Sequence, residues 1–152
     1  MKVNYSDQKI EFNKKSIFLA GPTPRKKEVK SWRPKALEIL EKLNFDGLVY
    51  VPEHKTEVKY DYLDQVEWER DGLKNAKIIV FWVERELVDM PAFTTNIEFG
   101  FFLAKTPEKV LYARPDDAPK NAYLDWLYGK ERGKKPFNSL EDVLKEAVKL
   151  LK

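Results

Sequence analysis

Short apolar blocks, separated by polar stretches with helical spacing, run along the whole chain. The blocks are residues 16–20, 48–52, 77–83 and 109–113, and they are rich in β-branched and aromatic side chains. Unbroken apolar runs of this length are typical of strands covered on both faces, as in a parallel sheet. A weaker alternation at residues 9–12 indicates a small ribbon in an N-terminal extension, residues 1–15, and a short strand is expected near residues 135–137.

Five further stretches have the apolar spacing or composition of helices. They are residues 29–44, 64–76, 93–105, 121–128 and 139–151, with Asp64 and Asn138 or Ser139 as candidate caps. The stretch 99–104 is apolar enough to predict a buried helix. Strands and helices alternate without a repeat or linker, which predicts one α/β domain over residues 1–152. We expect a single doubly wound, Rossmann or flavodoxin-like parallel sheet of about five strands, with helices on both faces.

The composition excludes several kinds of chemistry. The chain has no cysteine and one histidine, His54, so disulfides, thiolate nucleophiles and cysteine-ligated metals are ruled out and we expect no metal and no cofactor. The sequence lacks both G-x-G-x-x-G after the first strand and G-x-x-x-x-G-K-[ST]. Dinucleotide-dependent redox chemistry and P-loop phosphoryl transfer are therefore disfavoured.

The charge pattern and hydropathy disfavour a nucleic-acid ligand and a membrane location. Lys and Arg number 28 against 25 Asp and Glu, a net charge of +3, and the basic runs are short and lack interleaved stacking aromatics. No segment approaches about 18 uninterrupted apolar residues, and the N-terminus lacks the apolar core of a signal peptide. We expect a soluble, cytoplasmic protein.

Candidate binding residues follow the predicted strands, where open α/β sheets bind their ligands. Glu98 places a single carboxylate in the turn and helix after residues 77–83, although a first-turn helix carboxylate could simply stabilise the macrodipole. Gly21, Pro22 and Thr23 end the first strand, either as a ligand-facing wall or as an ordinary turn. Glu53 follows the second strand.

Other polar residues leave more than one interpretation open. His54 is more readily explained as a solvated loop residue than as a base, since no partner for it is visible in the sequence. Glu67, Glu69 and Asp71 crowd the first half of one predicted helix, and spacing alone does not choose among them. The polar, tyrosine-containing stretch 55–63 is expected to close over a ligand.

Several separated motifs occur together and in order: SIFLAGPTPR, SWRPKALEILEKL, GLVYVPE, QVEWERDGLKNAKIIVFWV, FTTNIEFGFFLA and RPDDAPKNAYLDWLY. Over roughly residues 16–128 the chain thereby resembles the nucleoside 2-deoxyribosyltransferase-like family. The resemblance implies that Glu98, in NIEFG, is the nucleophile. It implies that Glu69, three residues before the G-[IL]-x-N-A run at 72–76, contacts the nucleobase, and that Phe18 takes the place of an aromatic on the first strand.

The resemblance also implies a site shared between subunits of a homo-oligomer. Asn121, in PKNAYLD, matches an asparagine that reaches the sugar 5′-hydroxyl in a neighbouring subunit, with Tyr123 beside it. The alternative is that Asn121 caps a helix and the nearby aromatics pack within their own subunit.

The sequence departs from the family pattern at three places. Ala92 stands where better-known members carry a base-contacting aspartate, and Phe18 replaces a tyrosine. Thr94 and Thr95, followed by Asn96, stand where the nucleotide-hydrolysing branch tends to place a phosphate-binding serine. These three residues are candidate substrate contacts, while the preferred base and the choice of nucleoside or nucleotide stay open.

The activity implied is exchange of the base of a 2′-deoxynucleoside through a covalent glycosyl-glutamate, with retention of configuration. An anionic carboxylate stabilises an oxocarbenium-like transition state and then captures the sugar. The first alternative is an N-glycosidase acting on a nucleoside or nucleoside 5′-monophosphate, with water as acceptor. The second is a non-catalytic nucleotide-binding module, against which the acid pair Glu69 and Glu98 argues, because phosphate binding gains nothing from two carboxylates.

Overall fold

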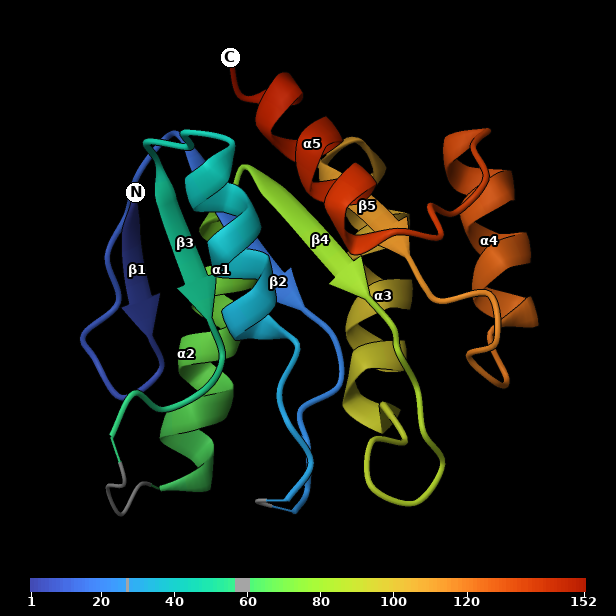
Figure 1. Cartoon of the computed structure of the whole chain (residues 1–152), viewed down its shortest axis with the longest axis horizontal. Helices are drawn as coiled ribbons and strands as arrows, with labels where there is room; N and C mark the ends of the chain where they lie inside the picture. The colour runs from blue at the N-terminus through green and yellow to red at the C-terminus, as the bar shows by residue number, and fades with distance from the viewer. Residues whose placement is uncertain (27, 57–60) are drawn as a thin grey trace.

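A five-stranded, all-parallel sheet forms the centre of the molecule. The computed structural model describes residues 1–26, 28–56 and 61–152. The strands are β1 (Lys2–Tyr5), β2 (Ser16–Ala20), β3 (Leu48–Val51), β4 (Ile78–Trp82) and β5 (Val110–Ala113). Their order across the sheet is β1-β3-β2-β4-β5, and every neighbouring pair is parallel. Figure 1 shows β1 at one edge and β5 toward the other.

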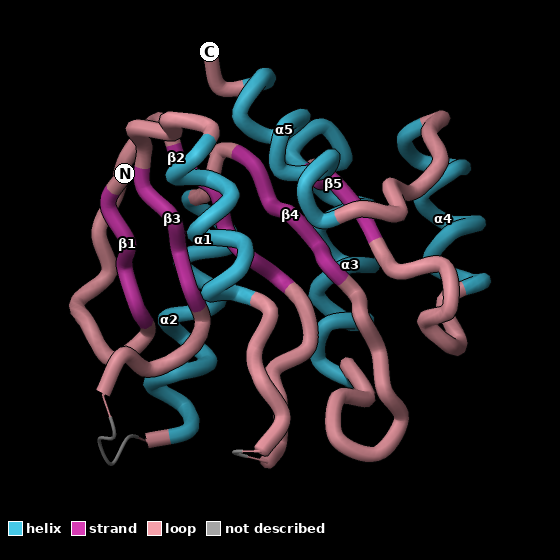
Figure 2. The backbone as a smooth tube through the Cα atoms, viewed as in Figure 1, coloured by secondary structure: helices cyan, strands magenta, loops and turns pink. Residues whose placement is uncertain are grey.

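Helices cover both faces of this sheet. They are α1 (Arg33–Lys42), α2 (Tyr62–Asn75), α3 (Phe93–Lys105), α4 (Ala122–Arg132) and α5 (Leu140–Leu150), with a short 3-10 turn, η1 (Pro107–Lys109). Side chains of α1 and α5 share one hydrophobic core with the sheet, and side chains of α2, α3 and α4 share the other. The predicted doubly wound α/β sheet is confirmed, and Figure 2 shows the two layers of helices around it.

Strands β2 to β5 are almost entirely apolar because successive residues enter different cores. On β4, Ile78, Val80 and Trp82 join the core beneath α1 and α5, while Ile79 and Phe81 join the core beneath α2 and α3. All five β4 residues are buried. Alternation of side chains across a pleated strand therefore requires an unbroken apolar run wherever both faces are covered.

Helix starts differ from those expected at α1 and α2. The helix expected over residues 29–44 begins at Arg33, since Pro34 occupies its first turn, where a missing N–H costs nothing. Helix α2 begins earlier than expected because Asp61, not Asp64, caps it: the Asp61 carboxylate accepts a hydrogen bond from the Leu63 N–H. Ser139 caps α5 as expected, accepting from the Asp142 N–H.

The ribbon expected at residues 9–12 does not form. The strand lies at Lys2–Tyr5 instead, paired in parallel with β3, and the Asn4 side chain holds the following segment. Its Nδ2 donates to the Lys9 carbonyl, and its Oδ1 accepts from the Glu11 N–H. The strand expected near residues 135–137 is reduced to a single bridge between Phe137 and Ala113. Part of the stretch 55–63, residues 57–60, lies outside the described residues.

The outer face of α3 and α4 is apolar and exposed. Phe93, Ile97 and Phe101 follow one another at four-residue spacing on α3, with exposed fractions of 68%, 74% and 53%. Tyr123 and Trp126 on α4 are 68% and 55% exposed, and α3 packs against α4. The expectation that the whole stretch 99–104 is buried is therefore wrong at Phe101 and at Ala104. We refer to the five large apolar residues as the α3–α4 face.

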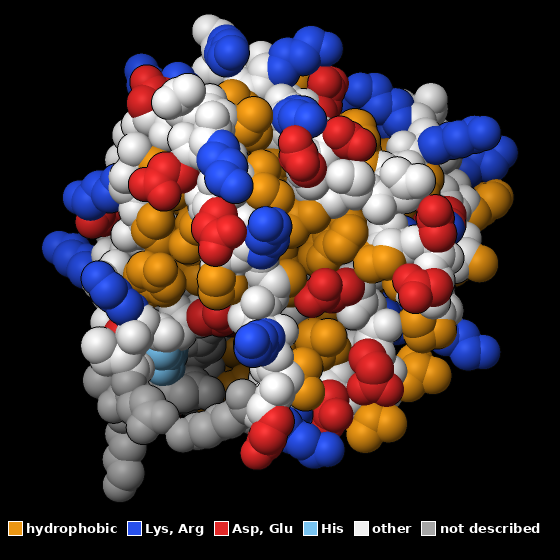
Figure 3. All heavy atoms as spheres, in the orientation of Figure 1, with side chains coloured by type: hydrophobic (Ala, Val, Ile, Leu, Met, Phe, Trp, Pro, Cys, Tyr) orange, Lys and Arg blue, Asp and Glu red, His pale blue; other side chains and the backbone are white. Residues whose placement is uncertain are grey.

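Elsewhere the surface carries side chains of both charges. On the face drawn in Figure 3, Lys and Arg side chains are interspersed with Asp and Glu rather than gathered into a patch of one sign. Among the described residues, no helix is long and apolar enough to cross a membrane.

Candidate active site

A cavity of about 300 Å³ opens at the carboxyl ends of the central strands. Its wall comes from the end of β2 and the loop after it, from α1, from α2, and from the turn that leads into α3. This volume lies at the lower end of the range of small-molecule sites. Eight of the residues expected from the sequence line it: Phe18, Gly21, Pro22, Thr23, Glu69, Thr94, Thr95 and Glu98.

Helix α3 presents Glu98 to the cavity together with Thr94 and Thr95. These positions are three and four residues apart, so they share one face of the helix. The adjacent Phe99 is 1% exposed and packs edge-on against Phe81 of β4, with ring centroids 5.2 Å apart. The apolar contact fixes α3 on the sheet, and the neighbouring polar face consequently points into the cavity.

The turn before α3 is held in an uncommon backbone conformation. Ala92 has φ 60° and ψ 37°, a left-handed geometry that costs about 1 kcal/mol for a residue with a Cβ. Arg85 stabilises this turn: its Nη1 donates to the Pro91 carbonyl at 3.1 Å, and its Nη2 donates to Asn96 Oδ1 at 2.7 Å. The alanine side chain cannot cap the helix, so the first N–H groups of α3 are left at the cavity edge.

The loop after β2 forms the opposite wall, and glycine is required there. Gly21 has φ 149°, and a Cβ at this position would lie 2.2 Å from the Trp82 carbonyl oxygen. The Trp32 indole N–H donates to the Pro22 carbonyl at 3.2 Å. This wall, formed by Gly21, Pro22 and Thr23, therefore packs closely against the end of β4 at Gly21.

Helix α2 supplies Glu69 and a side chain that orients it. Gln65 Nε2 donates to Glu69 Oε1 at 2.6 Å, and Gln65 Oε1 lies 2.9 Å from His54 Nε2. Gly72 lets α2 approach the cavity floor, because a Cβ there would lie 2.7 Å from Phe18 Cε2. Contrary to the expectation for a solvated loop histidine, His54 thus has a partner beside the site.

The two acids have raised pKa values for different reasons. Burial, followed by the negative charge of Glu69, raises the pKa of Glu98 to about 8, although Arg33 lowers it. Burial also raises the pKa of Glu69, against the lowering effects of the Gln65 hydrogen bond and Arg33. A carboxyl group with a pKa of about 8 holds its proton near neutral pH, so the protonated form of Glu98 is favoured there.

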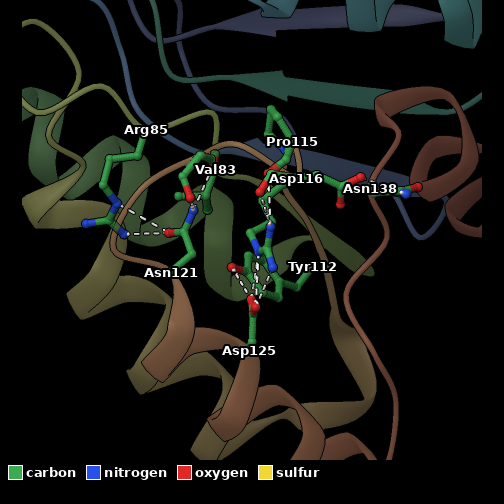
Figure 4. Close-up of polar contacts among 10 residues, drawn as sticks. Val83, Arg85, Tyr112, Pro115, Asp116, Asn121, Asp125 and Asn138 are labelled. Carbon is green, nitrogen blue, oxygen red and sulfur yellow. Dashed lines mark hydrogen bonds and ion pairs between the residues drawn. The ribbon is translucent and has the colours of Figure 1, made fainter.

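Four expected residues do not line the cavity. Glu53 pairs with Arg33 behind the wall, and Asn96 accepts from Arg85. Asn121 is 3% exposed, and its Oδ1 accepts from Arg85 Nε at 3.3 Å and from Nη2 at 3.0 Å; Figure 4 shows this contact. Tyr123 lies on the exposed α3–α4 face.

Sequence reasoning missed several residues that line the cavity. They include Arg25, Arg33, Tyr62, Gln65, Val66 and Phe93. A signal for Gln65 was available, because it precedes Glu69 by four residues on a predicted helix and must share its face. Arg33 gave no such signal, since its burial depends on partners from β2, the following loop and β3.

The sequence matches a known protein family over more than half of its length. Residues 14–116 match the family described as nucleoside 2-deoxyribosyltransferase like. The match covers more than half of the sequence, so the chain belongs to this family. The matched region contains every cavity residue named above and ends before Asn121. No curated protein matches the chain as a relative.

Proposed function

We propose that this protein is a nucleoside 2-deoxyribosyltransferase that exchanges the base of 2′-deoxynucleosides, with Glu98 as nucleophile. The observation that carries the proposal is the pair of largely buried carboxyl groups, Glu98 on α3 and Glu69 on α2, facing one cavity. Membership of the nucleoside 2-deoxyribosyltransferase-like family supports the substrate class. The remaining cavity side chains, including Phe18, Thr23 and Thr94, offer an apolar surface and hydroxyl groups to the base and sugar.

The proposed reaction proceeds in two displacements. In the first, a Glu98 carboxylate oxygen bonds to the anomeric carbon as the glycosidic C–N bond breaks, and the bonding electron pair leaves with the base nitrogen. Glu69 donates a proton to that base. In the second, a nitrogen of the incoming base attacks the anomeric carbon, Glu98 leaves as a carboxylate, and the proton on that nitrogen passes to Glu69. Two inversions give net retention of configuration.

This scheme requires Glu98 to lose its proton when substrate binds. A pKa of about 8 favours the protonated form of Glu98 near neutral pH, but the nucleophile must be ionised. A bound base whose nitrogen accepts a hydrogen bond from protonated Glu69 stabilises the proton there and leaves Glu98 charged beside the sugar. Burial raises the pKa of Glu69, which favours the protonated form that a general acid needs.

The reaction class is tested by incubating the protein with one deoxynucleoside, first alone and then with a second free base. We expect a new deoxynucleoside only when the second base is present. Release of free sugar at the same rate with and without the second base would identify a hydrolase instead.

The hydrolase alternative on nucleoside 5′-monophosphates has one observation in its favour. The N–H groups at the start of α3 have no side-chain cap and lie at the cavity edge with Thr94 and Thr95, while Arg25 contributes to the same cavity. Such a helix end favours phosphate oxygens. Cleavage of a 5′-monophosphate in strong preference to the matching nucleoside would select this alternative.

Glu69→Ala is expected to reduce exchange by about 100-fold, the usual contribution of a positioned general acid. The loss should be largest for bases that leave poorly without protonation and smaller for bases that are good leaving groups. The measurement is kcat/KM for a series of deoxynucleosides with different bases. Equal rates for wild type and variant with every base would contradict the role of Glu69.

The α3–α4 face supports the proposal of a symmetric homo-oligomer with shared sites. Five large apolar side chains exposed together on two neighbouring helices are typical of a surface that is covered by a partner. Asn121 directly precedes α4, two residues before Tyr123, and is held by Arg85. We propose that this end of α4 reaches the cavity of a second copy.

Complementation between two inactive variants tests the sharing of sites. We mix Glu98→Ala chains with Asn121→Ala chains under conditions of subunit exchange and expect activity to reappear. In a two-fold dimer each chain lends the residue that it receives, so one hybrid site has both residues intact. Mixing either variant with itself is the control. Proven exchange without recovered activity would mean that each chain builds its own site.

A further inference from the structure

Arg33 is a buried cation whose whole guanidinium is engaged at the cavity wall. The side chain is 1% exposed. Its Nε donates to the Leu19 carbonyl at 3.1 Å, and its Nη2 donates to the Gly21 carbonyl at 2.8 Å. Its Nη1 donates to Thr23 Oγ1 at 3.0 Å and to Glu53 Oε1 at 2.6 Å.

These bonds join four parts of the chain at one point. Arg33 begins α1, Leu19 belongs to β2, Gly21 and Thr23 belong to the loop after β2, and Glu53 follows β3. The fixed fork of a guanidinium can satisfy all these acceptors at once, whereas a lysine ammonium cannot. The loop wall of the cavity is therefore held in place from behind by one side chain.

The charge of Arg33 is also close enough to act on the acids. It lowers the pKa of Glu98, of Glu69 and of Glu84. Its partner Glu53 is 21% exposed, so water screens that carboxylate more than it screens the buried guanidinium. The positive charge of Arg33 is therefore only partly cancelled by Glu53, and it acts on the acids of the cavity.

The charged and titratable groups around Glu98 come from every element at the cavity. Glu69 and Tyr62 line it from α2, Arg33 lines it from α1, and Arg25 lines it from the loop after β2. Of these, Glu69 and Arg33 are the groups that perturb Glu98, with opposite signs. Arg33 is thus the group that opposes the effect of burial and of the second acid.

We propose that Arg33 is a positioning residue of this site, which holds the wall at Gly21 and Thr23 against the substrate and opposes the protonation of Glu98. This inference rests on the proposed function for its catalytic meaning. The effect on Glu98 is a property of the protein without substrate and can be measured independently.

The test is a direct titration of the glutamate side chains by NMR, with carboxyl-labelled protein, and Glu98→Gln identifies the Glu98 signal. In Arg33→Met the midpoint of Glu98 is expected to rise by about one pH unit or more, the usual effect of losing a close opposite charge. Glu53→Gln should lower the midpoint, because it removes a negative charge beside Arg33. Arg33→Lys keeps the charge and should leave the midpoint close to wild type while lowering Tm.

Arg114→Gln is the matched control, since Arg114 forms a similar ion pair with Asp125 at 2.6 Å but does not line the cavity. It should lower Tm without moving the Glu98 midpoint. Unchanged midpoints in both Arg33→Met and Glu53→Gln would overturn the proposal. If Arg33→Met does not fold, an unchanged midpoint in Glu53→Gln alone overturns it.

The kinetic readout separates this proposal from the proposed function. If wild type exchanges bases, the acid limb of the plot of kcat/KM against pH should move to higher pH in Arg33→Met and to lower pH in Glu53→Gln. A loss of rate with an unmoved limb would mean that Arg33 only supports the fold. Absence of any glycosyl transfer or hydrolysis in wild type would instead reject the proposed function, while the NMR midpoints still decide the role of Arg33.

Discussion

Replacing Glu98 with glutamine is expected to abolish base exchange while the protein stays folded. The amide has nearly the shape of the carboxyl group, but it cannot form the glycosyl intermediate or stabilise the developing positive charge. We expect kcat to fall at least 1000-fold, equivalent to about 4 kcal/mol of transition-state stabilisation. The measurement is exchange between a deoxynucleoside and a second base, with circular dichroism to verify the fold.

Glu67→Gln is the matched control for this prediction. It makes the same chemical change on α2, where Glu67 is 67% exposed and lies 3.5 Å from Arg70, and Glu67 does not line the cavity. Its exchange rate should match wild type. A Glu98→Gln variant that keeps more than about a tenth of the wild-type rate, a change below roughly 1.4 kcal/mol, would refute the assignment of the nucleophile.

Glu98→Gln is also expected to stabilise the folded protein relative to wild type, by an amount that grows as the pH rises. Burial and Glu69 raise the pKa of Glu98 from 4.5 to about 8 in the folded state. The folded state therefore holds this proton more tightly than the unfolded state does, and stability falls as the pH rises from about 4.5 to about 8. Glutamine does not titrate, so this loss is absent from the variant.

Thermal denaturation across this pH range measures the effect. The gain in stability should be near zero at pH 4.5 and reach on the order of 3 kcal/mol by pH 8, or roughly 6–12 °C in Tm for a protein of this size. Glu67→Gln, an exposed position, should show no such dependence. A Glu98→Gln variant with the same Tm difference at both ends of the range would contradict the raised pKa.

Much of the fold could be predicted because a strand that is buried on both faces requires an unbroken apolar run in the sequence. The apolar runs at 16–20, 48–52, 77–83 and 109–113 each contain a strand of the sheet. β1 could not be predicted in the same way, because at Lys2–Tyr5 only Asn4 is buried. It lies at the edge of the sheet, and its place depends on pairing with β3.

Some residues of the candidate site could be predicted from local helical spacing, whereas others depend on contacts between distant parts of the chain. Glu98, Thr94 and Thr95 could be placed together because helical spacing alone puts them on one face. Glu53 was noticed at a strand end, but its partner is Arg33, twenty residues earlier in the chain. The cluster of Arg85, Asn96 and Asn121 likewise joins distant segments, and Figure 4 shows the contact between Arg85 and Asn121.

The pKa order of the two acids could not be read from the sequence at all. Both are glutamates on helices, and the large upward shift at Glu98 comes from its burial and from the negative charge of Glu69, against the opposing charge of Arg33. These three residues lie on α3, α2 and α1. Only the packing of these helices over the sheet brings them to one cavity.

Mass spectrometry of the protein quenched during turnover tests the central claim most directly. The protein is mixed with a deoxynucleoside in the absence of a second base, denatured rapidly and digested with a protease. We predict a covalent deoxyribosyl group on the peptide that contains Glu98, and its loss when a second base is added before the quench. Turnover with an adduct on a different residue, or without any adduct at saturating substrate, would contradict the account.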